Sequence, residues 1–297
     1  MMQETGDRQA GAADLDHMRA VAHGMSGQDL PQWRGWTRQM RQQHTRRGHA
    51  GVCRRLCIWS RRPQILRHHG IPFVVRMISA PPADTLYDIL RGVAALTGDA
   101  VVADLARLVG KGVPADLSIA FNHKQIASKR WLVDELTKVL PKPDGPVFVL
   151  GAWYGVLGAL LLAAPRLDIA ELVSLDIDPD CAPIAEILNH RHVAAGRFRA
   201  VTADMMGLDF ERVEGGRPGL VINTSCEHLD DVPGWIATLP AGLPLLLQSN
   251  DYVREPDHRS CVPSLEAFKA QAGLSELWFA GALPTKNYTR FMLIGRR

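Results

Sequence analysis

The most constraining feature of this sequence is the stretch VFVLGAWYGVLGALLL at residues 147–162. Its four leading apolar residues indicate a buried strand, and its apolar end indicates a helix. Gly151 and Gly155 lie between them, where glycine favours a tight turn. Such a strand, turn and helix leave the first backbone N–H groups of the helix free for an anionic or polar ligand. A turn that uses glycine only for packing would show the same pattern.

The spacing of these glycines disfavours a dinucleotide-binding site. The fingerprint G-x-G-x-x-G would need glycine where this chain has Trp153. Trp153 and Tyr154 stand where a pyrophosphate needs bare backbone. We therefore expect a ligand without a pyrophosphate, which disfavours an oxidoreductase that uses a nicotinamide cofactor.

An acidic residue follows the second strand-like run. Residues 169–175 are mostly apolar and lead to Asp176, 25 positions after Gly151. A carboxylate at this point can accept hydrogen bonds from both hydroxyls of a ribose. Asp176 is therefore a candidate for binding the sugar of a nucleoside.

Polar residues also follow the third and fourth strands. The run 198–202 leads to Asp204 and Met205, which could contact the amino group and the ring of an adenine. The run 219–222 leads to Asn223 and a polar segment behind it. All these side chains are expected at the carboxyl edge of one sheet, where open α/β sheets bind their ligands.

Taken in this order, these residues resemble the class I S-adenosylmethionine-dependent methyltransferases over about residues 146–297. The resemblance implies S-adenosylmethionine as the cofactor. It also implies an α/β fold, a Rossmann-like seven-stranded mixed sheet with helices on both faces and a terminal antiparallel hairpin, here at 277–282 and 288–294. The expected cofactor-binding residues in this part of the chain are Gly151, Trp153, Tyr154, Gly155, Asp176, Asp204, Met205 and Asn223.

The chain departs from that family at two points. The family often has an acid two residues before the first glycine, where this chain has Val149. Some amino methyltransferases of the family have an Asn-Pro-Pro-aromatic motif beginning at the position of Asn223. Here Thr-Ser-Cys follows that asparagine, which argues against methylation of nucleobases.

The chain is expected to have three parts. Residues 1–76 carry 13 Arg, no Lys and 5 acidic residues without a hydrophobic period, which predicts a basic, disordered extension. Residues 77–143 are expected to form a small N-terminal helical cap, with two helices over 85–109 that meet at Gly98 and one over 122–140. Residues 144–297 are expected to form the S-adenosylmethionine-binding domain.

The helical cap contributes candidates for the site. In the resembled family such helices cover the methionine end of the cofactor, and Phe121 and Lys129 stand on that side of the cap. Lys129 could pair with the cofactor carboxylate. Alternatively, Lys129 belongs to an ordinary solvated face with Lys124 and Arg130.

Candidates for catalysis lie after the fourth and fifth strands. Glu227 and His228 could act as a general base pair, since a neutral imidazole titrates near physiological pH. Alternatively, His228 caps the following helix. Tyr252 completes the expected catalytic set, and the expected substrate pocket is formed by Phe121, Ser225 and Asn250.

Two reactions of the cofactor remain open, with methyl transfer to a small molecule favoured. The alternative is attack on the γ-carbon of the methionine moiety, by aminocarboxypropyl transfer or by cyclisation to azetidine-2-carboxylate with release of methylthioadenosine. Aromatic faces suit a sulfonium, and the candidates are Phe121, Trp153, Tyr154 and Tyr252.

A function of another class, nucleic-acid binding, would use the basic segment 1–76. We favour an extension without such a partner, because an Arg-rich tract without periodicity needs no ligand to explain it.

Composition limits the location of the protein. No apolar run of about 18 residues occurs, so no membrane span is expected. The 5 cysteines are scattered and odd in number, which indicates a reduced, cytoplasmic protein. Cys53 and Cys57 lack a second ligand pair, so no metal site is expected. The sequence leaves the oligomeric state open.

Overall fold

The computed structural model describes residues 65–68, 71–74, 83–210 and 216–297. The chain divides into two units, Met1–Ile78 and Ser79–Arg297. In the first unit, β1 (Ile65–His68) and β2 (Ile71–Val74) pair as an antiparallel hairpin, which the sequence analysis did not predict. The rest of the predicted basic extension, with Cys53 and Cys57, lies outside the described residues.

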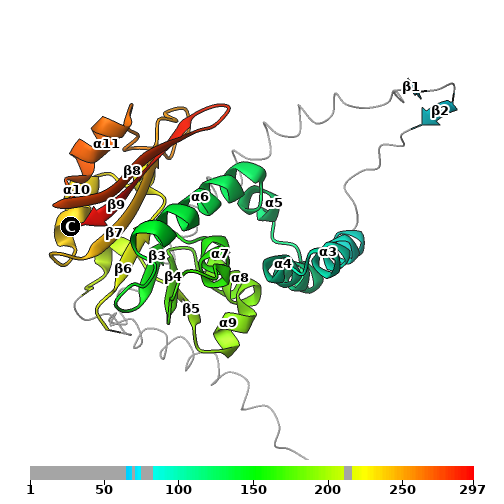
Figure 1. Cartoon of the computed structure of the whole chain (residues 1–297), viewed down its shortest axis with the longest axis horizontal. Coiled ribbons are helices and arrows are strands. Elements are labelled where there is room, and N and C mark those ends of the chain that lie inside the picture. Colours follow the sequence, from blue (N-terminus) through cyan, green and yellow to red (C-terminus); the bar gives the residue numbers. More distant parts are fainter. Residues whose placement is uncertain (1–64, 69–70, 75–82, 211–215) are drawn as a thin grey trace, which may run out of the picture. The chain divides into compact units, whose positions relative to one another are not determined.

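The second unit is built on a seven-stranded sheet (Figure 1). Five neighbouring strands run parallel in the order β5-β4-β3-β6-β7, and β9 then lies antiparallel between β7 and the edge strand β8. This topology confirms the predicted mixed sheet with its terminal antiparallel hairpin. The strands are β3 (Val147–Leu150), β4 (Leu172–Asp176), β5 (Phe198–Thr202), β6 (Leu220–Asn223), β7 (Pro244–Asn250), β8 (Glu276–Pro284) and β9 (Thr289–Arg296).

Helices cover both faces of the sheet because its central strand is apolar on both sides. Val147 and Val149 pack on one face in the cluster that holds Leu132 and Leu161, whereas Phe148 packs on the other with Trp235. Figure 1 shows α10 and α11 on one side of the sheet and α6 and α7 on the other. These helices are α6 (His123–Val139), α7 (Val156–Ala163), α10 (Val232–Thr238) and α11 (Leu265–Ala272), with α8 (Cys181–Leu188) and α9 (His190–Ala194) between β4 and β5.

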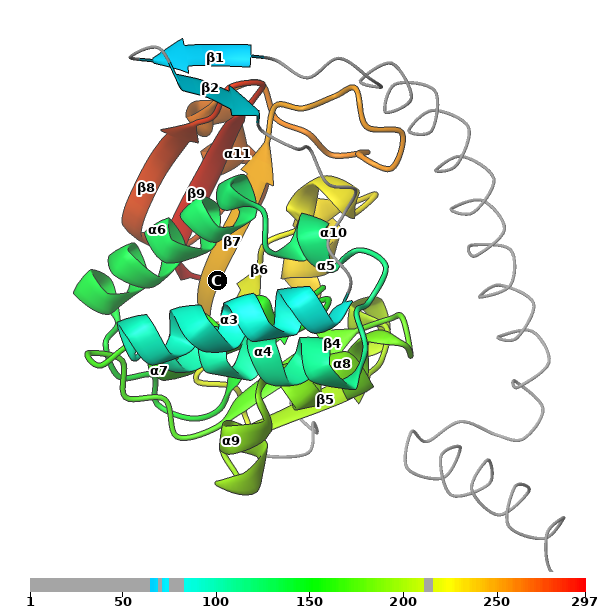
Figure 2. The ribbon, with the colours of Figure 1, turned by 90° about the vertical axis from the view of Figure 1, so that its right-hand side faces the viewer.

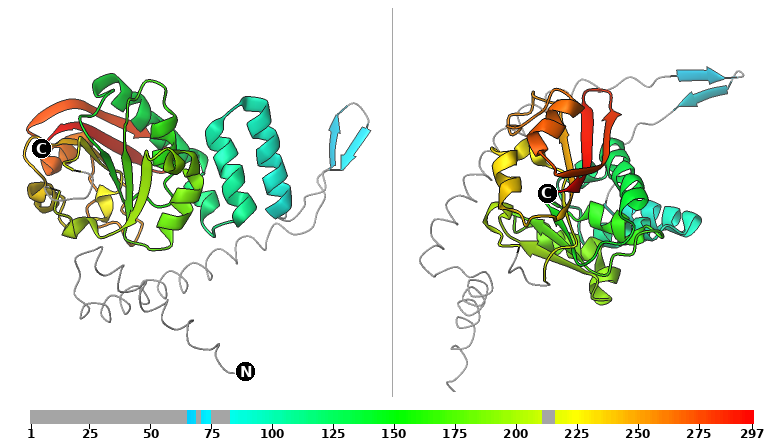
Figure 3. Two further views of the ribbon diagram at one scale, coloured as in Figure 1. Left: turned by 90° about the horizontal axis from the view of Figure 1, so that it is seen from below. Right: turned by 60° about the vertical axis from the view of Figure 1, so that its left-hand side comes forward.

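The cap is helical, as predicted. α3 (Ala83–Thr97) and α4 (Ala100–Lys111) lie side by side (Figure 3) and meet at Gly98, after which the Asp99 carboxylate caps α4. A short helix, α5 (Leu117–Ala120), leads to α6, whose first turn is capped by the side chain of Asn122. Figure 2 shows α6 in front of β7 and β9, against which it packs. Among the described residues no helix combines the length and the apolar character that a membrane crossing needs.

The turn between β3 and α7 uses glycine for backbone geometry and for packing. Gly151 and Gly155 have φ of +60° and +70°, which favours glycine. A Cβ atom on Gly155 would lie 2.9 Å from both Ala185 Cβ and Asn189 Nδ2 of the neighbouring helical segment. The turn thus brings α7 close to α8, and Gly155 serves this packing.

Replacing Gly155 with alanine should destabilise the protein more than the same change at Gly242. Gly242 also has a positive φ, of +73°, but has open space around its Cβ position. Both variants carry the left-handed backbone cost of about 1–2 kcal/mol. Only Gly155→Ala adds a collision, which costs about 1–3 kcal/mol more. Urea unfolding measures both free energies, and equal losses would show that the α7–α8 contact tolerates the extra methyl group.

Candidate functional site

A cavity of about 360 Å³ opens at the carboxyl ends of β3, β6 and β7. This volume lies in the range of small-molecule sites, about 300–1,000 Å³. Its lining comes from α6, from the turn after β3, from the segments after β6 and β7, and from the start of β9. It brings together these predicted residues: Lys129, Gly151, Trp153, Tyr154, Ser225, Glu227, His228, Asn250 and Tyr252.

Asp176 lies beside the cavity and not in its lining. Its Oδ2 accepts a hydrogen bond of 2.7 Å from the backbone N–H of Trp153, and its Oδ1 accepts one from the backbone of Asp178. Burial raises the pKa of Asp176 above its ordinary value. The carboxylate therefore joins the end of β4 to the turn after β3.

Several other predicted site residues lie outside the lining, where their side chains bond to nearby atoms of the chain or pack against apolar neighbours. Asp204 caps the short helix at 205–207 by accepting from the N–H of Met206. Asn223 is fully buried; its Oδ1 accepts from the N–H of Ser225, and its Nδ2 lies 3.5 Å from the sulfur of Met205. Phe121 packs in the apolar cluster that contains Trp153 and does not line the cavity.

Two cations share the cavity. Lys129 donates a hydrogen bond of 2.7 Å to Gln125, and burial lowers its pKa from 10.5 to about 8, an effect to which the charge of Arg290 adds. Arg290 comes from β9, where it pairs in register with Asn250, and it donates to the carbonyl oxygen of Thr224. Its Nε is buried and has no partner in the described part of the chain. Such a pair favours an anionic ligand.

Glu227 is the buried carboxylate of the site, with 2% of its surface exposed. Its Oε1 accepts a hydrogen bond of 2.5 Å from Asn250 and lies 3.4 Å from Nη1 of Arg290. Its Oε2 has no hydrogen-bond partner among the described residues. Its backbone carbonyl accepts from the N–H groups of Arg259 and Ser260, which holds the loop after β7 against the segment after β6.

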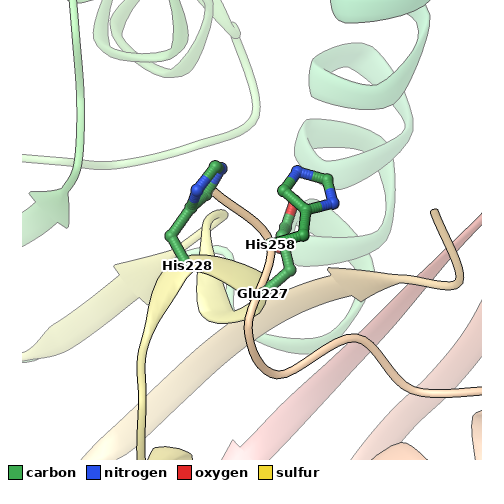
Figure 4. A group of neighbouring side chains, drawn as sticks. All are labelled: Glu227, His228 and His258. Carbon is green, nitrogen blue, oxygen red and sulfur yellow. The ribbon is translucent and has the colours of Figure 1, made fainter. Parts of the chain in front are cut away.

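Two histidines stand beside this carboxylate (Figure 4). The rings of His228 and His258 are 4.7 Å apart at nearly a right angle. Nδ1 of His228 lies 3.2 Å from the carbonyl oxygen of Asp257, and Nδ1 of His258 lies 2.7 Å from that of Tyr252. A carbonyl oxygen only accepts, so Nδ1 carries the hydrogen and each neutral ring keeps a lone pair on Nε2.

The helix-capping role considered for His228 belongs to another residue. The carboxylate of Asp231 accepts from the N–H of Gly234 and caps α10. His228 lines the cavity instead.

Aromatic rings form two pairs in the lining. Trp153 and Tyr154 lie 4.9 Å apart, and Tyr252 and Tyr288 lie 5.8 Å apart. Three of the four aromatic residues predicted to surround a sulfonium therefore line the cavity, and Phe121 does not.

The sequence analysis missed several residues of the lining. Arg290 and Gln248 could have been predicted from the sequence, because each is a polar residue next to the apolar run of a strand. His258 had none, since its position depends on the path of a loop. The missed residues with polar groups include Thr224, Gln248, Glu255, His258, Tyr288 and Arg290.

No protein-family model and no curated protein sequence matches this chain. Solved structures similar to it include the N-methyltransferase NodS from Bradyrhizobium japonicum with S-adenosyl-L-homocysteine, at 12% identity over 67% of this chain and 99% of that one, with a TM-score of 0.47. Another is the magnesium protoporphyrin IX methyltransferase from Synechocystis with the same molecule bound, at 17% identity over 71% and 99%, with a TM-score of 0.45. A third is an O-methyltransferase family protein from Burkholderia thailandensis, at 18% identity over 72% and 70%, with a TM-score of 0.40. These likenesses concern the fold alone.

Replacing Lys129 with methionine should stabilise the protein most at neutral pH. The pKa of Lys129 is about 8 in the folded state and near 10.5 in the unfolded state. Between pH 8 and pH 10.5 the amine is therefore protonated to a greater extent in the unfolded protein than in the folded one. Wild-type stability therefore rises with pH across this window, and the cost of burying the charge is fully present below about pH 8. We expect Lys129→Met to gain about 2 kcal/mol at pH 7 and to lose this gain by pH 10.

Unfolding by urea at several pH values measures this difference. Lys138→Met is the matched control, since it removes an exposed lysine from the same helix. A gain in the free energy of unfolding for Lys129→Met that stays constant from pH 7 to 10 would contradict the lowered pKa of Lys129.

Proposed function

We propose that this chain is an S-adenosylmethionine-dependent transferase that moves the methyl group to a small-molecule acceptor. One observation carries the proposal: a single cavity at the carboxyl edge of the sheet joins the Gly151 turn to two cations and to a buried carboxylate with a free oxygen. Ligands of open α/β sheets bind at this edge.

The residues present fit the amino-acid end of this cofactor. Lys129 and Arg290 can pair with its carboxylate. The faces of Trp153 and Tyr154 can lie against the sulfonium.

The nucleoside end fits the same edge beyond the cavity. Asp176 and Asp204 end neighbouring strands, and the N–H of Ala203 donates to the carbonyl of Asp176, so the two carboxylates belong to adjacent segments. Met205 lies close to the turn, with its Cε 3.7 Å from the Cβ position of Gly151. We propose that the ribose lies at Asp176 and the adenine at Asp204.

The chain's own contribution to the reaction is orientation and proton removal. When bound, the cofactor supplies a methyl carbon made electrophilic by its sulfonium. His228 and His258 offer neutral Nε2 atoms that can take a proton from an acceptor hydroxyl or amine. His228 is exposed at the rim, so we propose that the acceptor enters there.

Calorimetric titration of the full chain with S-adenosylmethionine tests the cofactor assignment. Lys129→Met should weaken binding about 10- to 100-fold, because a charge-assisted hydrogen bond contributes about 1.5–3 kcal/mol. Lys138→Met, on the same helix but outside the cavity lining, should bind as wild type does. Absence of binding by the wild-type protein, or equal affinities for all three, would remove the assignment.

Proton uptake on binding gives a second readout. Near pH 9 a Lys129 with a pKa of about 8 is mostly neutral, and a paired carboxylate should raise that pKa again. Binding at this pH should therefore take up close to one proton, as titrations in buffers of different ionisation enthalpy report. The Lys129→Met variant should show almost no uptake, and uptake that survives the substitution would assign the proton to another group.

The reaction itself is identified by its nucleoside product. Incubation with S-adenosylmethionine and a pool of small alcohols, phenols and amines should give S-adenosylhomocysteine, detected by mass spectrometry. Methylthioadenosine formed without any acceptor, faster than in protein-free buffer, would contradict methyl transfer and indicate attack on the γ-carbon.

A further inference from the structure

We propose that Glu227, His228 and His258 bind a divalent transition-metal ion, zinc foremost, at the rim of the cavity. The proposal does not rest on S-adenosylmethionine as the cofactor. It assigns the Nε2 lone pairs of both histidines to the ion, so in the metal-bound protein these atoms do not take the proton of the acceptor. The residues form no recognisable metal-binding motif in the sequence, because His258 lies 30 positions beyond His228 and on a different segment.

The three side chains lie near one another (Figure 4). One possible ligand atom of each lies within 4.8 Å of those of the other two. Around zinc, bonds of about 2.0–2.2 Å place neighbouring ligand atoms roughly 3–4 Å apart. The cluster can therefore close on an ion through small side-chain movements, and His228, which is exposed, is free to make them.

Both imidazoles are already oriented as metal ligands. A ligating histidine commonly donates its other ring N–H to a backbone carbonyl, which fixes the tautomer and the ring direction. His228 does this with Asp257, and His258 does it with Tyr252. The Nε2 lone pairs that remain are the groups that bind metal.

The buried carboxylate is an independent indication of a ligand. Oε2 of Glu227 has no hydrogen-bond partner among the described residues, although only 2% of the residue is exposed. Leaving such a buried oxygen unpaired is costly. Oε1 is held by Asn250, so the carboxylate is fixed in place and Oε2 is the free ligand.

The surroundings select the class of metal. Arg290 lies 3.4 Å from Oε1, so the carboxylate charge is already partly neutralised and a site for a hard ion such as Mg²⁺ or Ca²⁺ is disfavoured. Two imidazoles and one carboxylate suit zinc and neighbouring transition metals. Three protein ligands leave at least one coordination position, which an oxygen or nitrogen of a small molecule entering the cavity can occupy.

Metal binding by the chelator-treated full chain tests the site. Titration with Co²⁺ should give visible d–d absorption at one ion per chain, and Zn²⁺ should displace it. His228→Gln and His258→Gln should each weaken this binding about 100-fold or more, since even changes to outer-shell partners cost 10- to 100-fold. His123→Gln, which removes an exposed histidine at the start of α6, should leave the spectrum unchanged.

A wild-type protein without this absorption, or a spectrum unchanged in both cavity variants, would overturn the proposal. A second measurement needs no variant: modification of the wild-type histidines by diethylpyrocarbonate, mapped by mass spectrometry with and without Zn²⁺. Zn²⁺ should protect His228 and His258 and leave His123 reactive. Equal modification of the two cavity histidines with and without Zn²⁺ would overturn the site as well. Neither experiment uses S-adenosylmethionine, so failure of the metal site and failure of the proposed function are separate results.

Discussion

The hydrogen bond from the backbone N–H of Trp153 to the carboxylate of Asp176 fixes the turn on which the site depends. Trp153 has a φ of +51° and is the only described non-glycine residue with a positive φ. A side chain at this φ costs roughly 1–2 kcal/mol. The bond to a half-buried carboxylate helps to offset that cost. It also directs the Trp153 and Tyr154 rings into one pair beside the cavity.

Glu227 joins several segments at the opposite wall of the cavity, as Asp176 joins β4 to the turn after β3. Through its side chain it contacts Asn250 of β7 and Arg290 of β9, and through its backbone carbonyl it holds the loop that carries His258. Removing this carboxylate would leave a buried arginine with less compensation and a loop with one anchor fewer. The same residue therefore positions the cations, the histidines and the acceptor side of the cavity.

The sequence was sufficient for the fold because the local signals agreed with one another. The apolar run at β3, the helix expected over 122–140 and the Gly98 break each corresponded to an element within one or two residues. The mixed sheet and its terminal antiparallel pair followed from the family resemblance. Here local propensity and the global arrangement favour the same structure.

The site was predicted only in part, for a physical reason. Lys129 lies within the predicted helix of the cap, and Glu227 and Tyr252 closely follow β6 and β7, so their edge of the sheet could be inferred. Asp204 and Asn223 stand at the expected strand ends, but their side chains bond to nearby backbone and sulfur atoms, which a residue type does not reveal. Arg290 and His258 reach the cavity through strand register and loop path, and both depend on contacts far apart in the sequence.

The most direct test of the account is a crystal structure of the full chain grown with S-adenosylhomocysteine. We expect electron density for its amino-acid end inside the cavity, within hydrogen-bond distance of Lys129 or Arg290. The adenosine should extend over the Gly151 turn toward Asp176 and Asp204. Density for the molecule at another place, or a cavity that stays free of it at saturating concentration, would contradict the account.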